Sequence, residues 1–453
     1  MESTDVLVIG SGIAGLCAAI EAARAGATVA IACAGKTMSG SSFFPGTWGL
    51  GLIGPVNEDD EQDLIDTIQT VGGGVADPEL IQTFVHGIPQ AIDWLEQDLG
   101  VELQRPQSAE SAQQKQFIPC FDHKTRMWRG LTRKPLEDAC AAQIELLGIR
   151  LLPRHELIDL VEDTTGKITG AVLYNQTDER IVTFTAKATI IAAGGTGGLF
   201  ERSLTSADVL SSTQAIAQAH GASLTNIEFM QMMPGFIEPR RNLVFNEKTW
   251  RYVKFDQPVD IANEKLDDLL EQRSGYGPFT SRLASRAIDL AIDQAGDEGL
   301  ALHYDFPRKD VPEFVETFAT WLQDEHGIAP SDEMRVAMYA HAANGGIKID
   351  KTAYTGVEGL YAVARQQAAC TARPHRRAIE RQWHRIRAYR GRISGSSSTG
   401  RFRGWHTGGY RPPRAWHRYS NRRAPNPLPQ THNEHLLHDQ QDRTRPIRGA
   451  SRA

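Results

Sequence analysis

Residues 5–15 of the chain, Asp5-Val-Leu-Val-Ile-Gly10-Ser-Gly12-Ile-Ala-Gly15, decide its fold. The first five form a short apolar run, which is typical of a buried parallel strand. The next six match the G-x-G-x-x-G fingerprint, and the alanine-rich stretch after them predicts a helix over 16–25. Residues 26–32 read as a second strand. The sequence therefore predicts a βαβ unit that holds a dinucleotide at the helix N-terminus.

Each glycine of this fingerprint has a mechanical role. Gly10 permits the tight turn, Gly12 lets the backbone approach a pyrophosphate, and Gly15 allows the helix to pack closely on the strand. The acidic residue that usually binds the ribose at the end of the second strand is absent, and Cys33-Ala-Gly-Lys36 stands there instead. A buried Cys is most simply core packing. Ribose recognition must then come from elsewhere in the chain.

A second glycine cluster lies far along the chain. The apolar run 188–193 predicts a strand, and it ends in Gly194-Gly-Thr-Gly-Gly198. Before it, residues 149–174 alternate in β fashion around Asp163-Thr-Thr-Gly166, which predicts a hairpin. Two dinucleotide-type strands separated by a long insertion predict an α/β domain whose strand order is interrupted by other segments.

Length and composition exclude several classes of protein. A chain of 453 residues with a hydrophobic fraction of 41% can form two or three soluble domains. It has no apolar run of about eighteen residues, so we expect no membrane span. The acidic N-terminus lacks the basic region of a secretory signal. The five cysteines are scattered without a CxxC spacing, which argues against disulfides or a structural zinc and favours the cytoplasm.

The charge is divided unevenly along the chain. Residues 364–453 hold 20 of the 49 basic residues, all of them Arg, but only 4 of the 55 acidic residues. One interpretation is a basic arm for nucleic acid. The other interpretation, which we prefer, is a segment translated out of frame from a GC-rich gene.

Several ordered motifs together resemble the flavoprotein family of fumarate reductases, succinate dehydrogenases and L-aspartate oxidases. The resemblance runs from about residue 4 to 363, and L-aspartate oxidases are most similar around residues 29–95. Besides Gly10–Gly15, the matching segments are Ser39-Gly-Ser-Ser-Phe-Phe-Pro-Gly46, Ala192-Ala-Gly-Gly-Thr-Gly197, Asn226-Ile-Glu-Phe-Met-Gln231, His341-Ala-Ala-Asn-Gly-Gly346 and Gly356-Val-Glu-Gly-Leu-Tyr-Ala-Val363.

The resemblance implies an α/β fold with a Rossmann-like FAD-binding domain that is interrupted by an α+β capping domain. The FAD-binding domain would comprise 1–234 and a return segment at 341–363, and the capping domain would comprise 235–340. Membrane-complex relatives carry a histidine near Ser39–Gly46 that bonds to the flavin. Because no His occurs between Met1 and Val85 here, we expect non-covalent FAD.

The implied activity is transfer of a hydride between flavin N5 and a C–C or C=C bond of a small, carboxylate-bearing substrate, with an arginine as proton donor. The electron donor or acceptor is unknown, and nucleic acid is not an expected partner. The resemblance assigns catalytic roles to Arg282 and His341, although the alignment near Arg282 can slip by a residue and Arg286 can be a solvated helical arginine. It assigns cofactor binding to Gly10, Ser11, Gly12, Ala14, Gly15, Cys33, Gly40, Ser41, Ser42, Gly46, Leu157, Ala193, Gly194, Gly195 and Thr196.

The chain departs from the family directly after Gln231. The family has His-Pro-Thr there, and this chain has Met232-Met233-Pro234-Gly235, so that a thioether replaces the histidine and nothing replaces the hydroxyl. The change predicts a more apolar pocket and weakens the case for succinate, fumarate or aspartate. L-aspartate oxidase and a non-catalytic flavin-binding remnant remain alternative interpretations. The loop 121–129 either supplies cations to an anionic substrate or forms a surface charge cluster.

The larger departure follows Val363. The family continues with a flavin-contacting stretch of the type GExxGGxHG and then N/D-R-L/I-G-G. Codons rebuilt across the boundaries of residues 364–372 permit GEAAGGMHG, and those of 373–387 in the remaining frame permit DRIGGQSSGNGIVFG. We therefore hypothesise that the tail is out of frame, with a second frame change near Ala372–Arg373. The lost segment would supply a helix N-terminus over the flavin and a substrate arginine. The chain as written should then bind FAD poorly, expose core and be catalytically impaired.

Overall fold

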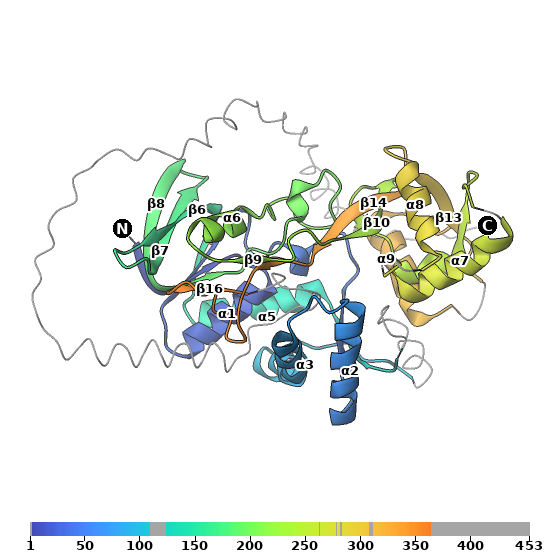
Figure 1. The fold of residues 1–453 in the computed structure, drawn as a ribbon. Coiled ribbons are helices and arrows are strands. Elements are labelled where there is room, and N and C mark those ends of the chain that lie inside the picture. Colours follow the sequence, from blue (N-terminus) through green and yellow to red (C-terminus); the bar gives the residue numbers. More distant parts are fainter. Residues whose placement is uncertain are drawn as a thin grey trace, which may run out of the picture. The chain divides into compact units, whose positions relative to one another are not determined.

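The computed structural model describes residues 2–108, 124–261, 263–277, 279–280, 283–307 and 311–363. Its larger sheet has seven strands in the order β5-β2-β1-β8-β7-β6, with β16 also paired to β8. The strands are β1 (Glu2–Ile9), β2 (Val29–Cys33), β5 (Arg150–Pro153), β6 (His155–Glu162), β7 (Ile168–Asn175), β8 (Arg180–Ile191) and β16 (Leu360–Ala362). The predicted α/β fold class is confirmed (Figure 1).

The βαβ unit forms as predicted. β1 and β2 are parallel, with Leu7 opposite Ala30, and α1 (Ile13–Arg24) connects them. On its other side β1 pairs in parallel with β8, so that Leu7 is also opposite Thr189. Both faces of β1 are covered, because Val8 packs on the α1 side and Leu7 on the opposite face, and both are fully buried. Burial on both faces explains why β1 is apolar throughout its second half.

The predicted hairpin is present, and the stretch that contains it forms three strands, β5, β6 and β7, where two were expected. β6 and β7 are antiparallel, with Leu157 opposite Leu173, and the turn lies at 163–166. The start of the alternating stretch forms a separate strand, β5, which pairs in parallel with the end of β2 through Leu152 and Ala32. The β2–β5 pairing extends the larger sheet beyond β2.

A group of helices packs on the α1 side of the sheet. Their apolar faces contribute Leu64, Val85, Leu95 and Leu136 to one large core that also contains Leu16 of α1. The helices of this group are α2 (Glu58–Val71), α3 (Pro78–Asp93), η2 (Trp94–Asp98) and α5 (Arg133–Leu146), and a two-stranded antiparallel sheet of β3 (Leu50–Gly54) and β4 (Met127–Leu131) accompanies them. No helix in the described part of the chain is long and apolar enough to cross a membrane.

A second, five-stranded sheet has the order β11-β10-β14-β13-β12. Its long central strands β10 and β14 are antiparallel and lead into a group of helices (Figure 1). Its core contains Phe236, Trp250 and Phe318. The strands are β10 (Met230–Glu238), β11 (Leu243–Val244), β12 (Val253–Phe255), β13 (Leu300–Tyr304) and β14 (Met334–Ala343), and the helices are η4 (Glu247–Tyr252), α7 (Asn263–Tyr276), α8 (Arg286–Gln294) and α9 (Glu313–His326).

The predicted domain boundaries, 234 and 340, fall on two strands that pair with each other. Met233 lies opposite Tyr339 and Met232 opposite Ala340. The chain therefore leaves and re-enters the region of the larger sheet along one antiparallel ladder. Three short elements complete this connection, namely α6 (Ser212–Ala219), β9 (Leu224–Thr225) and β15 (Gly346–Ile347), the last two paired with each other.

Candidate functional site

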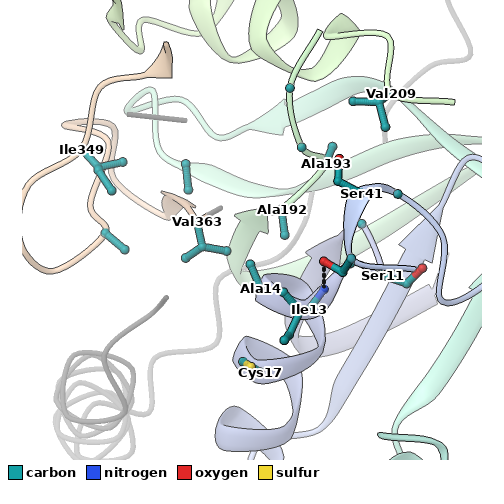
Figure 2. A pocket seen from close by; sticks show the side chains of 18 of the residues that line it. Ser11, Ile13, Ala14, Cys17, Ser41, Ala192, Ala193, Val209, Ile349 and Val363 are labelled. Carbon is teal, nitrogen blue, oxygen red and sulfur yellow. Dashed lines mark hydrogen bonds between the residues drawn. The ribbon is translucent and has the colours of Figure 1, made fainter. Parts of the chain in front are cut away.

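A cavity of about 1480 Å³ opens where β1 and β8 end. Its lining includes Gly10 and Gly12 after β1, Ala193 after β8, and Val363 after β16. The carboxyl ends of parallel strands are where open α/β sheets bind ligands. Figure 2 shows Ser11, Ile13 and Ala14 at the start of α1, with Ala192 and Ala193 beside them.

The glycine turn has the geometry that its sequence predicted. Gly10 has φ +112°, and a β-carbon there would overlap the backbone of Ala192. A β-carbon on Gly15 would overlap the carbonyl oxygen of Gly10 and touch the β-carbon of Ala192 at 3.1 Å. Gly12 differs, because its nearest neighbour would be the Oγ of Ser42 at 3.8 Å. Gly10 and Gly15 therefore serve the fold, and the open side of Gly12 faces space that a phosphate can use.

The N-terminus of α1 is suited to an anion. Gly12 is its N-cap residue and provides no side chain, and the first turn contains no acidic residue. The N–H of Ile13 donates to Ser42 Oγ at 3.2 Å (Figure 2). Ser11 Oγ similarly accepts from the N–H of Met38 at 3.0 Å. The two serines hold the loop 38–42 across the helix end, where the helix dipole favours negative charge.

Most of the predicted cofactor-binding residues line this cavity. These are Gly10, Ser11, Gly12, Ala14, Cys33, Gly40, Ser41, Ser42, Leu157, Ala193, Gly194 and Gly195. Gly15, Gly46 and Thr196 are not part of the lining. Gly15 lies beneath the turn, as described above.

Gly46 and Thr196 have structural surroundings instead. The carbonyl of Gly46 accepts from the N–H of Val244 in β11 at 2.8 Å, and a β-carbon on Gly46 would overlap the backbone of Asn242. Two residues on, the ring of Trp48 packs edge-on against Phe318 of α9 with centroids 4.8 Å apart. Thr196 begins the turn of η3 (Gly197–Leu199), where its carbonyl accepts from the N–H of Leu199.

Cys33 lies at the edge of the cavity and is buried. Its Sγ lies 3.8 Å from the carbonyl oxygen of Leu152 in β5. Burial raises the pKa of the Cys33 thiol above its ordinary value, and the charge of Asp208 adds to the rise. The side chain is therefore a neutral thiol, which fits core packing better than ribose binding.

The predicted catalytic residues lie elsewhere. His341, on β14, is half-buried, and its Nδ1 lies 2.9 Å from Gln231 Oε1 on the neighbouring strand β10. Neither residue lines the cavity. Gly345, four residues on, is needed because a β-carbon there would overlap the backbone of Asn226, which does line the cavity. Arg282 lies outside the described residues, and Arg286 is the first residue of α8.

Met233, the thioether in place of the family's histidine, and its neighbour Met232 both lie on β10 but differ in burial. Met233 is buried in a small cluster with Leu204, Ile237 and Tyr339. Met232 is 38% exposed. Neither methionine lines the cavity.

Two cations of the predicted loop 121–129, Lys124 and Arg126, contact α2, whereas residues 127–129 lie on β4 and Arg129 donates to the carbonyl of Trp128. Residues 121–123 lie outside the described part of the chain. The Arg126 side chain is fully buried, pairs with Asp60 and contacts Asp63 at 2.6 Å, and Lys124 Nζ contacts Asp63 at 2.6 Å as well. These two charges stabilise the attachment of the loop to α2, which favours the charge-cluster interpretation over substrate binding.

The lining also includes residues that the sequence did not indicate. Asp208 and Val209 come from the loop after β8, and Lys348 from the segment after β15. They belong to no recognised motif, and only the fold brings them to the cavity. Among the described residues, no group of three or more His, Cys, Asp or Glu could hold a metal ion.

The fold and this cavity define a dinucleotide-binding α/β protein. The sequence model of the FAD binding domain family matches residues 5–251, which is more than half of the chain. The chain belongs to this family and its cofactor is FAD. The open side of Gly12 and the acid-free helix N-terminus fit the pyrophosphate, and by family the chain is a FAD-dependent oxidoreductase.

Individual relatives agree with this assignment. The chain is 28% identical to an L-aspartate oxidase of Halobacterium salinarum, over 80% of this chain and 69% of the relative. It is 27% identical to a fumarate reductase (CoM/CoB) of Methanothermobacter marburgensis, over 79% of this chain and 66% of the relative. Its fold is similar to the Sdh1 structure of Mycobacterium smegmatis, with a TM-score of 0.64 at 22% identity over 86% of this chain and 70% of that chain.

Proposed function

We propose that the chain transfers a hydride between flavin N5 and a C–C or C=C bond of a small substrate that carries a carboxylate. FAD, when bound, supplies the redox chemistry. The observation that carries the proposal is the cavity, because the acid-free end of α1 and the loop 38–42 can hold a pyrophosphate there. The relatives support the reaction class, since they include L-aspartate oxidases, a fumarate reductase and a succinate dehydrogenase flavoprotein.

The roles of the proposed site residues follow from their chemistry. We assign the cofactor to the cavity residues named above, and non-covalent binding to the lack of a histidine before His86. We assign a substrate carboxylate to His341, whose Nδ1 faces Gln231 Oε1 across the β10–β14 ladder. An amide oxygen that accepts from Nδ1 would hold the imidazole in one orientation. Arg282 is our proposed proton donor.

The domain division supports such a site. We propose that 1–234 and 341–363 form the FAD-binding domain and that 235–340 form the capping domain. His341 and Gln231 then lie beside the two boundaries, on the strands that join the domains. A substrate between the domains would be shielded from water, which strengthens electrostatic interactions with its carboxylate.

Reduced flavin protein provides the direct test. Because the chain as written should be impaired, a version whose reading frame is repaired after Val363 is loaded with FAD, reduced anaerobically and mixed with fumarate, and the flavin absorbance is followed. Return of the oxidised spectrum at a rate that saturates with fumarate supports the proposal. Flavin that stays reduced with fumarate and with other small unsaturated carboxylates contradicts it. Because most of the first relatives are L-aspartate oxidases, a second sample of oxidised protein receives L-aspartate, and bleaching there favours that alternative.

We further propose that residues 364–453 are translated out of frame. Val363, the last described residue, lines the cavity, and the family-like stretches recovered from other frames belong directly after it. Resequencing the gene across the codons for residues 360–375 tests this. A frame change there is the expected result, and an intact frame would contradict it.

A further inference from the structure

The end of β2 needs a carboxylate that its own sequence does not supply. In the dinucleotide fingerprint an acidic residue at this position accepts hydrogen bonds from the ribose hydroxyls. Here the strand ends at Cys33, followed by Ala34 and Gly35, and all three line the cavity. None of these side chains can accept a charge-assisted hydrogen bond.

The carboxylate of Asp208 lies at this place. Its Oδ2 is so close to Gly35 that a β-carbon on Gly35 would overlap it. Oδ2 also accepts from the hydroxyl of Ser39 at 3.1 Å. The contribution of its charge to the raised pKa of the Cys33 thiol is a further sign of its position beside the strand end.

The other oxygen of this carboxylate is left without a partner. Asp208 lines the cavity, and its Oδ1 is buried with no hydrogen-bond partner among the described residues. A buried polar atom without a partner is costly, and such atoms in native folds usually meet a water, an ion or a ligand. The Ser39 bond fixes the carboxylate and leaves this acceptor for a ligand in the cavity.

The second glycine cluster makes this arrangement possible. The N–H of Gly198 donates to the carbonyl of Val209 at 2.9 Å, and a β-carbon on Gly198 would come within 2.7 Å of the carbonyl oxygen of Ala207. A β-carbon on Gly197 would overlap Thr205 Oγ1. The glycines therefore let the segment 203–209 fold back over the end of β8. Val209, beside Asp208, is seen across the cavity from the start of α1 in Figure 2.

We infer that Asp208 is the ribose-binding acid of this chain, so that its carboxylate accepts from the hydroxyls of the adenosine ribose of FAD. The inference rests on the proposed function and deepens it. It explains how the dinucleotide is held although Cys33 replaces the usual acid. The carboxylate comes from a loop far along the sequence instead of from β2.

Three of the six other acids in the cavity lining are less suited to this role, as their contacts show. Glu21 Oε1 accepts from Arg24 and from Trp94 Nε1 at 2.7 Å, inside the core. Asp350 Oδ1 accepts from the N–H groups of Thr352 and Tyr354 within its own turn. Glu156 lies on β6, where its Oε2 is 3.5 Å from Gln176 Nε2. Of these three acids, Glu156 has the carboxylate that could bind the ribose in place of Asp208, so its substitution provides the matched control.

The test uses the purified full-length chain with ADP and 2′-deoxy-ADP as probes, and calorimetry as the readout. These probes need only the nucleotide half of the site, so the tail does not affect the comparison. Wild type should bind ADP about ten- to a hundredfold more tightly than 2′-deoxy-ADP, the range expected for one hydrogen bond to a charged acceptor. Asp208→Ala should reduce ADP affinity by a similar factor and abolish the preference. Glu156→Gln should keep it.

The outcomes separate the inference from the proposed function. A preference that survives in Asp208→Ala, or that Glu156→Gln abolishes instead, overturns the assignment of Asp208 while the chain remains a dinucleotide-binding protein. A wild-type chain that binds ADP and FAD but does not distinguish 2′-deoxy-ADP also overturns it. If neither ADP nor FAD binds the wild-type chain, the proposed function fails and the inference fails with it. Asp208→Asn provides a second, isosteric variant if the alanine variant does not fold.

Discussion

The α-carbon of Gly15 lies directly against the carbonyl oxygen of Gly10, with no room for a β-carbon between them. Because of this contact, the first turn of α1 packs closely on the end of β1. Gly12, only three residues earlier, has open space beside it, with Ser42 Oγ 3.8 Å from the position of a β-carbon. The same motif therefore contains a glycine that the fold requires and one that the ligand requires.

Substituting these two glycines should separate folding from binding. Gly15→Ala should lower the free energy of unfolding by about 1–3 kcal/mol, because the added methyl group has no space. Gly12→Ala should cost no more than about 1 kcal/mol. It should nevertheless weaken FAD binding at least about tenfold, because the methyl group occupies the approach to the pyrophosphate. Thermal unfolding and flavin titration of both variants provide the measurements, and equal loss of stability in the two would contradict this division.

His220 links α6 to β6 and should make stability depend on pH. Its Nε2 lies 2.8 Å from Asp159 Oδ1, and its Nδ1 contacts Glu162. Burial lowers the pKa of His220, but hydrogen bonds and charges from Asp159 and Glu162 outweigh burial, so the pKa lies above its ordinary value of 6.5. The stabilisation is therefore complete below about pH 6.5 and is lost as the pH rises through the raised pKa.

The measurement is the unfolding free energy of wild type and His220→Gln across this pH range. The difference in unfolding free energy between wild type and His220→Gln should be largest at acidic pH and decrease toward alkaline pH. A His220→Gln variant whose unfolding free energy follows the same pH profile as wild type would contradict this role of His220.

Arg273, on α7, is a fully buried cation among the helices beside the second sheet. Its side chain is fully buried, with Nη1 2.6 Å from Glu247 Oε2 and Nη2 2.9 Å from Asp289 Oδ1. Burial lowers the pKa of Arg273, but Glu247 and Asp289 outweigh it and hold the pKa above its ordinary value. Arg273→Met should destabilise the protein by about 3–5 kcal/mol, because it leaves carboxylates unpaired in the core.

Arg251, on η4 beside the same sheet, is the matched comparison for Arg273. It is 36% exposed and pairs with Glu271 at 3.1 Å. Arg251→Met should cost less than about 1 kcal/mol, as expected for an exposed ion pair. Chemical denaturation of the two variants measures the difference, and similar costs would contradict a dominant role for burial.

The local parts of the fold were readable from the sequence. The strand, glycine turn and helix of residues 5–24 have signals within a few residues of each other, and so does the hairpin at 163–166. The tertiary contacts were not readable. The contacts of Gly46 with the turn before β11, and the turn that Thr196 begins, could not be predicted from the sequence. Asp208 had no local signal, because only the packing of its loop brings it to the end of β2.

Repairing the reading frame should restore function. A gene that encodes the family-like stretches after Val363 should produce protein that binds FAD at least about tenfold more tightly than the chain as written, because the restored helix N-terminus would face the flavin. In the repaired chain, His341→Ala should raise KM for a carboxylate substrate about ten- to a hundredfold, since it removes one hydrogen bond to a charged group. Repaired protein with unchanged FAD affinity would contradict the frame hypothesis.

The central claim is that residues 2–363 form the nucleotide half of a FAD site. Titrating the purified chain with FAD, in competition with either FMN or ADP, tests it most directly. We predict that FAD binds, that ADP displaces it, and that FMN, which lacks the adenosine half, does not displace it even in large excess. Displacement by FMN but not by ADP, or the absence of any FAD binding, would contradict the account.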